Sequence, residues 1–187
     1  VGMNENKRRY NVMAIVKKDA YYLSSTGVNK IHCCIWQDDE AEPKALFQIA
    51  HGVSEHIERY DEFARFLASK GYVVFGNDHL GHGKSVEYIE ELGFFAEENG
   101  DLRLIDDMHI LYNIMHKRFP TLPYYLFGHS MGSFCARVYV TAFHSEMAGL
   151  IICGTGELPA AAVLLEKPVE LLCQKLGARA VAPASLL

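Results

Sequence analysis

The sequence lacks the features that mark several large classes of protein. Its basic residues are scattered except for Lys7-Arg8-Arg9, and the formal net charge is −5, which argues against nucleic acid as a partner. The N-terminus is polar and has no apolar stretch, so a signal peptide is not expected. The five cysteines, an odd number, lack the spacing of metal ligands or of a disulfide framework. We therefore expect buried free thiols in a reducing, cytoplasmic compartment.

The sequence also has no uninterrupted apolar stretch long enough to span a membrane. The apolar stretch 148–165 is the nearest approach to one, but Gly154-Thr155-Gly156-Glu157 and Pro159 interrupt it. A buried strand followed by a loop explains this stretch better, so no transmembrane segment is predicted. A chain of 187 residues, 50% of them hydrophobic, can instead bury one sizeable globular core.

Short apolar runs alternate along the chain with segments of helical periodicity. Residues 20–24 and 31–36 are rich in β-branched, aromatic and cysteine residues, which indicates an antiparallel hairpin at a sheet edge. Further strands are predicted at 45–50, 72–75, 124–127 and 149–153, those at 72–75 and 149–153 as buried strands, and helices at 60–70, 102–119 and 134–143. This order predicts an α/β fold with a mostly parallel sheet and an antiparallel N-terminal hairpin.

The pentapeptide Gly128-His129-Ser130-Met131-Gly132 joins the run at 124–127 to an apolar helical stretch. A strand, a sharp turn and a helix in this order are typical of a nucleophile elbow. A serine hydroxyl needs a neighbouring base and a turn that exposes its oxygen before it can attack a carbonyl at neutral pH. The two glycines would let the strand and the helix approach each other closely. Ser130 is therefore the candidate catalytic nucleophile.

The segment His51-Gly52-Val53-Ser54-Glu55-His56 follows the strand at 45–50, at the edge where open α/β sheets bind ligands. Acyl transfer needs two backbone N–H groups aimed at the developing oxyanion, one from the residue after the nucleophile and one from a loop such as this. We assign the N–H groups of Val53 and Met131 to this oxyanion hole. The alternative is that His51-Gly52 is only a turn out of the strand, and the elbow favours the functional reading.

The segment Asp78-His79-Leu80-Gly81-His82-Gly83-Lys84-Ser85 contains a glycine-lysine-serine sequence found in phosphate-binding loops. Such a loop needs a glycine five positions before Gly83, where this chain has Asp78. Nucleotide binding is therefore not expected. Asp78, His79 and His82 form only a weak pattern for metal ligands. We expect a structural loop that borders the active site, and no metal or organic cofactor.

Taken in order, these three motifs, the first followed by Arg59-Tyr60, resemble the monoacylglycerol lipase and lysophospholipase branch of the α/β-hydrolase superfamily, also called serine aminopeptidase-like hydrolases. The resemblance covers residues 21–154. It implies the α/β-hydrolase fold, with Ser130 as the nucleophile and the Val53 and Met131 amides as the oxyanion hole.

By analogy with members that cleave monoglycerides, the resemblance also implies a binding site for the polar head of the substrate, made by Glu55, Arg59 and His129. A surface ion pair between Glu55 and Arg59 is the alternative for the first two residues. For His129 the alternative is a packed elbow residue.

The chain departs from the family pattern after the nucleophile. The family's catalytic residues follow in the order Ser, Asp, His. Only 57 residues follow Ser130, and they contain no aspartate and one histidine, His144. His144 would lie about 20 Å along the helix that begins at the elbow. We therefore expect residues 1–157 to be the N-terminal part of an α/β-hydrolase core, truncated after about strand six. Residues 158–187, with an amphipathic helix near 169–176, would begin a helical lid.

The hypothesis that follows is a serine hydrolase that cleaves carboxylic esters of lipids, of monoacylglycerol or lysophospholipid type, through an acyl-enzyme on Ser130. The 187-residue chain is expected to be inactive by itself. An aminopeptidase-type amide hydrolase and a non-catalytic binding or interaction module are the alternatives. The expected partner is a small acyl ester or lipid, with transient membrane-surface contact through the lid, and the oligomeric state stays open.

Overall fold

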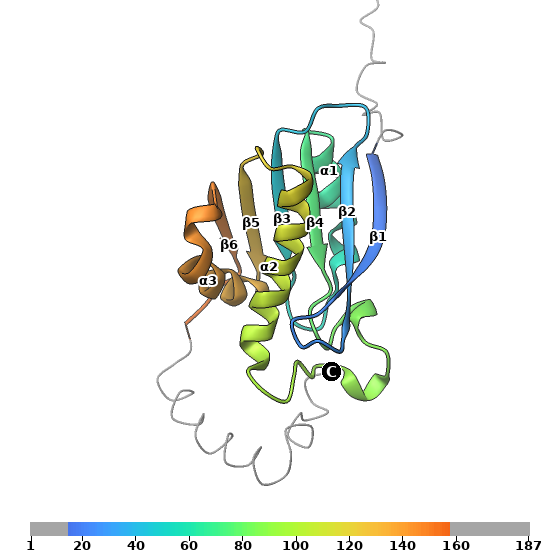
Figure 1. Ribbon diagram of the computed structural model, residues 1–187, viewed down its shortest axis with the longest axis vertical. Helices are drawn as coiled ribbons and strands as arrows, with labels where there is room; N and C mark the ends of the chain where they lie inside the picture. The colour runs from blue at the N-terminus through green and yellow to red at the C-terminus, as the bar shows by residue number, and fades with distance from the viewer. Residues whose placement is uncertain (1–14, 158–187) are drawn as a thin grey trace, which may run out of the picture.

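A single sheet with helices on both faces organises the computed structural model, which describes residues 15–157 (Figure 1). The sheet has six strands in the order β1-β2-β4-β3-β5-β6. The strands are β1 (Ile15–Leu23), β2 (Lys30–Asp38), β3 (Ala45–Ala50), β4 (Tyr72–Asn77), β5 (Tyr124–His129) and β6 (Gly149–Cys153). The α-helices are α1 (Asp61–Ala68), α2 (Gly100–Arg118) and α3 (Met131–Phe143), and short 3-10 helices span Ile57–Tyr60, Gly83–Ser85, Ile89–Glu91 and His144–Glu146.

The predicted architecture is confirmed. Strand β2 runs antiparallel to both β1 and β4, whereas β4, β3, β5 and β6 are parallel to one another. The hairpin is longer than predicted, because β1 begins at Ile15 rather than Ala20. The extra residues include Lys17, Lys18 and Asp19. An edge strand tolerates charged side chains, so its first half carries no apolar pattern that the sequence could reveal.

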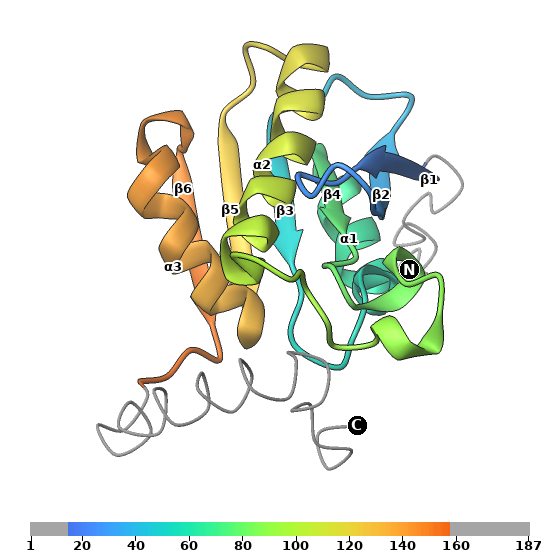
Figure 2. The same ribbon diagram turned by 60° about the horizontal axis from the view of Figure 1, so that its bottom comes forward.

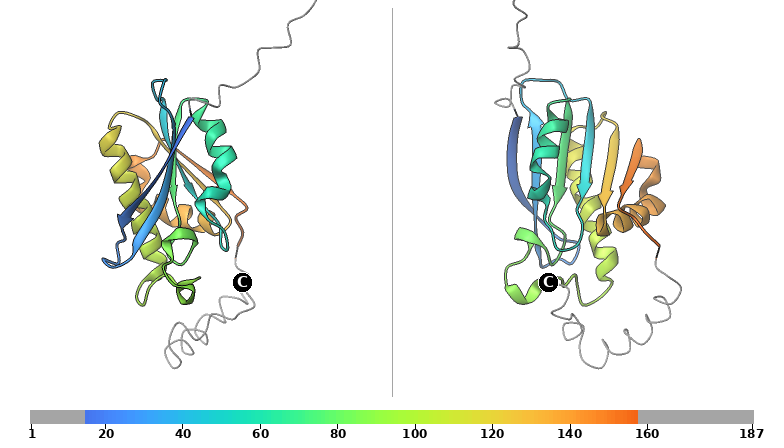
Figure 3. Two further views of the ribbon diagram at one scale, coloured as in Figure 1. Left: turned by 90° about the vertical axis from the view of Figure 1, so that its right-hand side faces the viewer. Right: turned by 180° about the vertical axis from the view of Figure 1, so that it is seen from behind.

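The core has two layers, one on each face of the sheet. Helices α2 and α3 cover one face and α1 covers the other, as the edge-on view in Figure 3 shows. Successive strand residues point to opposite faces, so Leu46 joins the α2 side and Phe47 the α1 side. Trp36 is fully buried on the α1 side, where its indole N–H donates a hydrogen bond of 2.8 Å to Asp61. Strands β3 and β4 are buried on both faces, as expected for β4 from its continuous apolar run.

Strand β6 lies where predicted, but its predicted burial is wrong. It pairs with β5 alone among the described strands, and Ile151 and Ile152 are 46% and 37% exposed. The expectation of buried thiols fails at the same place: Cys153 is exposed, whereas Cys33, Cys34 and Cys135 are buried. An apolar run predicts a strand, but burial depends on what packs against it.

Two further findings concern membrane contact and the lid. Within residues 15–157, every helix is too short or too polar to cross a bilayer. The predicted lid at 158–187, with its helix near 169–176, lies outside the described residues.

Candidate active site

Ser130 sits in a strained turn between the last residue of β5 and the first residue of α3. Its backbone has φ 51° and ψ −119°, in a region that residues other than glycine rarely adopt. Three hydrogen bonds hold this turn. The Ser130 N–H donates to the Cys153 carbonyl at 3.0 Å, and the Ser130 carbonyl accepts the Ser133 N–H at 2.8 Å. The Ser133 hydroxyl donates to the same carbonyl at 2.6 Å. This is the geometry of a nucleophile elbow.

The two elbow glycines are required by close backbone contacts. A Cβ atom at Gly128 would collide with the carbonyl oxygen of Gly132, and one at Gly132 would collide with the carbonyl of Ala50 in β3. Helix α3 can therefore pack closely against the ends of β5 and β3 only because both positions are glycine. Gly52 lies against the nucleophile itself, because a Cβ there would be 3.1 Å from the Ser130 Cβ. The loop after β3 and the elbow therefore meet at one edge of the sheet (Figure 2).

A buried histidine fixes the start of that loop. The Nδ1 of His51 donates to the Gly52 carbonyl at 2.7 Å, and its Nε2 accepts the His79 N–H at 2.9 Å. This arrangement requires the neutral ring. Burial lowers the pKa of His51 to about 4, so the ring stays neutral at physiological pH. The loops after β3 and β4 are thereby tied together.

Glu55 clamps the loop from the other side. Its Oε1 accepts the Tyr60 hydroxyl proton at 2.7 Å and the Gly52 N–H, and lies 3.3 Å from the His129 Nδ1. Its side chain is only 13% exposed. Burial opposes ionisation, but the hydrogen bonds from Tyr60, Gly52 and His129 outweigh it and hold the pKa of Glu55 below its ordinary value. An ionised carboxylate therefore shapes the loop beside Ser130.

The three residues predicted to bind the polar head of the substrate lie near one another. Glu55 and His129 lie together beside the elbow, and His129 also packs edge-on against Tyr60. Arg59 is exposed, and its Nε lies 3.9 Å from the Glu55 Oε2. This distance supports the alternative of an ion pair between these two residues. His129 is partly exposed rather than packed away.

Of the two predicted oxyanion donors, Met131 follows Ser130 in the chain, and Val53 follows Gly52, which lies against Ser130. Met131 is the first residue of α3, where N–H groups have no acceptor within the helix. The Val53 N–H donates no hydrogen bond within residues 15–157, and the residue is exposed. The next residue, Ser54, has φ 57°, which marks a sharp turn in the loop. Among residues 15–157 neither amide has a hydrogen-bond acceptor, so the oxyanion hole stays a prediction that this geometry permits.

The loop after β4 is organised around the buried carboxylate of Asp78. Its oxygens accept the Ile57 N–H at 2.7 Å and the Lys84 N–H at 2.8 Å, and its Oδ2 lies 2.8 Å from the His32 Nδ1. The Lys84 amide, which a phosphate-binding loop would offer to a phosphate, is thus already engaged. Sequence reasoning gave Asp78 no such role, because two of its partners, Ile57 and His32, are distant in the sequence.

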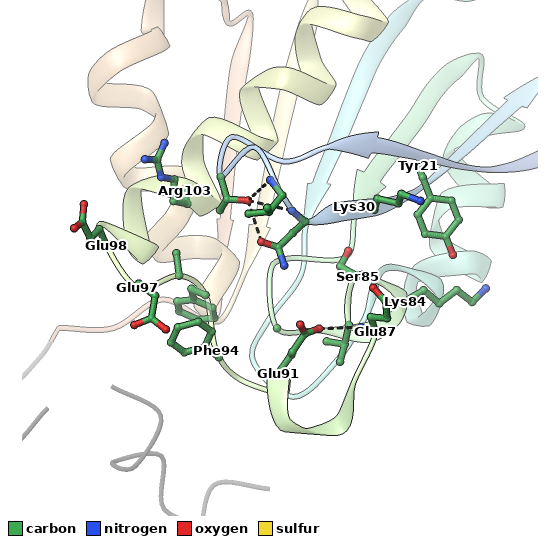
Figure 4. Close-up of a pocket in the computed structure, with 17 residues that line it drawn as sticks. Tyr21, Lys30, Lys84, Ser85, Glu87, Glu91, Phe94, Glu97, Glu98 and Arg103 are labelled. Carbon is green, nitrogen blue, oxygen red and sulfur yellow. Dashed lines mark hydrogen bonds between the residues drawn. The ribbon is translucent and has the colours of Figure 1, made fainter. Parts of the chain in front are cut away.

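One cavity near this loop does not contain the elbow. It measures about 780 Å³ and lies between the hairpin turn, the segment 81–98 and Arg103 at the start of α2 (Figure 4). Neither Ser130 nor Gly52 lines it. Acidic and basic side chains surround it, including Glu87, Glu91 and Lys84. The elbow geometry, not this cavity, marks the candidate active site.

No catalytic base contacts the nucleophile in the part of the chain that the structure describes. Between residues 15 and 157, no hydrogen bond to the Ser130 hydroxyl is present. His144 begins a 3-10 helix beyond the end of α3, at the opposite end of that helix from Ser130. His144 thus lies at the far end of α3, as the sequence predicted.

The mostly parallel sheet, the antiparallel hairpin and the strained serine between β5 and α3 define an α/β-hydrolase. A family model described as "Serine aminopeptidase, S33" matches residues 41–185, and the chain belongs to this family.

Known relatives agree with this assignment. The "Monoglyceride lipase" of Homo sapiens is 30% identical over 155 residues, which cover 79% of this chain and 46% of that protein. The "Monoacylglycerol lipase" of Mycolicibacterium smegmatis is 30% identical over 137 residues, 73% of this chain and 46% of that protein. A solved carboxyl esterase from Bacillus coagulans superposes with a TM-score of 0.79 at 30% identity, covering 86% of this chain and 51% of that one. The chain is thus monoacylglycerol lipase-like, and it spans about half the length of the curated relatives it matches.

Proposed function

We propose that the protein hydrolyses carboxylic esters of lipids, of the monoacylglycerol or lysophospholipid type, through an acyl-enzyme on Ser130. The strained elbow serine, in contact with the Gly52 loop, is the observation that carries this proposal. The names of the human and mycobacterial relatives, both lipases of monoglycerides, support the substrate class. The Bacillus coagulans esterase, solved in complex with glycerol, supports the alcohol part.

The proposed reaction proceeds in two steps. The Ser130 oxygen attacks the ester carbonyl, a base takes its proton, and the alcohol leaves with that proton, which gives the acyl-enzyme. Water then attacks the acyl-enzyme and releases the fatty acid. The Val53 and Met131 amides would stabilise the oxyanion in both steps, and the positive N-terminal end of α3 adds to this stabilisation. We place the triad acid and base outside residues 15–157, and expect negligible turnover from the 187-residue chain alone.

The polar head of the substrate is proposed to bind beside Glu55, His129 and Arg59. His129 is the best placed of the three, because it adjoins Ser130 and is partly exposed. Glu55 is already occupied by loop hydrogen bonds, so it would act mainly by holding His129 and the loop in position. We retain residues 158–187 as the start of a lid that sets acyl specificity and touches the membrane surface transiently.

Amide hydrolysis is the second candidate, because the family description names a serine aminopeptidase. A panel of p-nitrophenyl esters of increasing chain length, compared with aminoacyl anilides, distinguishes the two activities on the full-length protein. Esters should be cleaved and anilides spared. Preferential cleavage of the anilides would overturn the lipid ester proposal in favour of the peptidase.

Labelling with a fluorophosphonate tests the nucleophile directly. Ser130 should be labelled in the full-length protein, and Ser130→Ala should abolish both labelling and turnover. The 187-residue chain should label far more slowly than the full-length protein, because in this proposal the catalytic base lies outside these residues. Equally fast labelling would show that a base lies within the chain. A full-length protein that neither labels nor turns over any ester would instead favour the non-catalytic binding module.

A further inference from the structure

Three metal-binding side chains meet on the hairpin, on the face of the sheet that α1 covers. Asp19 of β1 is paired directly with Cys34 of β2, and His32 lies two residues before Cys34 on the same face. The Asp19 Oδ1 lies 2.9 Å from the His32 Nε2 and 3.6 Å from the Cys34 Sγ, and the last two atoms are 3.9 Å apart. No part of the proposed hydrolysis uses this cluster.

The spacing of these three atoms fits a tetrahedral zinc ion. With metal–ligand bonds of about 2.0–2.3 Å, the ligand atoms of such a site lie about 3.3–3.6 Å from one another. The distances of 2.9, 3.6 and 3.9 Å depart from this by a few tenths of an ångström. Histidine, cysteine and carboxylate are also the donors that zinc prefers. A fourth position remains for water.

The histidine is oriented as zinc ligands usually are. Its Nδ1 lies 2.8 Å from the Asp78 Oδ2, which directs the Nε2 toward Asp19 and Cys34. A carboxylate behind a ligating imidazole fixes its tautomer and increases its basicity. Asp78 is itself held by the Ile57 N–H at 2.7 Å, so this support is rigid.

The charges around the cluster are compatible with an ion. Both ring nitrogens of His32 lie within 2.9 Å of a carboxylate oxygen, an arrangement that favours a proton on each nitrogen in the metal-free protein. A zinc ion would replace the proton between His32 and Asp19 and the thiol proton of Cys34. Two protons leave to solvent and two positive charges enter, so the net charge of the cluster does not change.

Two lysines adjoin the cluster. Lys17 and Lys84 each lie 3.6 Å from an oxygen of Asp19, and each also bonds to Glu58. Lys84 is 50% exposed and its bond to Glu58 is 2.8 Å, so it can leave Asp19 without losing its partner. The side chain of Asp19 is 44% exposed, which gives an ion access to the buried His32 and Cys34.

We propose that Asp19, His32 and Cys34 form a zinc-binding site, with Asp78 as its positioning residue. Bound there, the ion would tie the β1–β2 hairpin through His32 to the loop after β4. The ion would take no part in the chemistry at Ser130, because the cluster is separate from the elbow.

Cobalt(II) provides the test, because a tetrahedral thiolate site gives Co²⁺ intense visible bands and a sulfur-to-metal charge-transfer band. The full 187-residue chain, treated with a chelator and kept reduced with a phosphine, is titrated with Co²⁺ and then with Zn²⁺. We expect one Co²⁺ per chain, displacement by Zn²⁺, and affinity that falls as pH falls, because the ligands must lose their protons.

Matched variants assign the signal. Cys34→Ala should lose the charge-transfer band, whereas Cys33→Ala, one residue away on the opposite face, and Cys153→Ala should keep it. Asp78→Asn should weaken binding by about 10–100-fold. Lys84→Gln should bind several-fold more tightly, a gain that misfolding could not produce.

Other outcomes would overturn the proposal. An absent charge-transfer band in a chain with native circular dichroism would reduce the cluster to an ion-pair network. A band that survives Cys34→Ala but disappears in Cys153→Ala would assign the metal to an exposed thiol instead.

Discussion

The loop edge of the sheet is held by hydrogen bonds and close backbone contacts, whereas its β6 side exposes apolar side chains. At the loop edge (residues 51–56, 78–85 and 128–132), buried carboxylates accept backbone N–H groups and glycines permit backbone contacts. On the β6 side, apolar side chains of α3 and β6 face solvent and border a hollow of about 840 Å³. We refer to Phe134, Val138 and Ile152, which line this hollow, as the open face.

The difference predicts which part of the chain tolerates substitution and which does not. Around Ser130, small shifts would break hydrogen bonds or cause collisions, so we expect substitutions to be costly there. On the open face the side chains are 37–46% exposed, so substitutions should cost little. Four substitutions, each with a matched control, test this contrast.

Gly132→Ala should have the largest effect on stability. The added methyl group would collide with the Ala50 carbonyl, which is backbone and cannot move aside. We expect a loss of about 3 kcal/mol or more in the free energy of unfolding, at the upper end for overpacking. Gly156→Ala is the control, because among residues 15–157 a Cβ there meets nothing within 4 Å. Equal urea midpoints for the two variants would mean that the elbow is not tightly packed.

Asp78→Asn should have the next largest effect, a loss of about 2–3 kcal/mol in the free energy of unfolding. The Ile57 and Lys84 N–H groups would then donate to a neutral amide instead of a charged carboxylate, which weakens both hydrogen bonds. The exposed Asp106→Asn should stay within about 0.5 kcal/mol of the parent.

The same carboxylate predicts a pH dependence. Burial opposes ionisation of Asp78, but bonds from His32, Ile57 and Lys84 outweigh it and lower its pKa below the ordinary 3.8. Its contribution to stability is therefore complete above pH 3.8 and is lost as pH falls through the lowered pKa. Urea unfolding across this range should show a shallower acid loss in Asp78→Asn than in the parent. Parallel curves would assign the acid sensitivity to other carboxylates.

Tyr60→Phe should have a smaller effect at the same edge. It removes one hydrogen bond to Glu55 without changing the ring, which should cost about 1 kcal/mol. Tyr72→Phe is the control, since the Tyr72 hydroxyl makes no hydrogen bond within residues 15–157. If both variants unfold at the same urea concentration, Glu55 does not depend on Tyr60.

The sequence predicts some features of these two regions and not others. The elbow was predictable because Gly128, Ser130 and Gly132 are local and their spacing reports the turn. Asp78 and His32 are 46 residues apart, and only the β2–β4 pairing brings them together. The exposure of β6 was not predictable either, because an apolar run has the same pattern whether or not a neighbour covers it.

Val138→Lys on the open face should have the smallest effect on stability and a visible effect on association. Val138 is 46% exposed on α3, so a lysine can reach water, and the free energy of unfolding should change by less than about 0.5 kcal/mol. Contiguous exposed apolar side chains favour self-association, so the charge should reduce it, as measured by sedimentation velocity across protein concentrations. Val28→Lys is the matched control: Val28 is 81% exposed in the hairpin turn, away from the open face. It should leave association unchanged. A loss above 1 kcal/mol in Val138→Lys alone would show that α3 is covered in solution, and the contrast between the two regions would then be wrong.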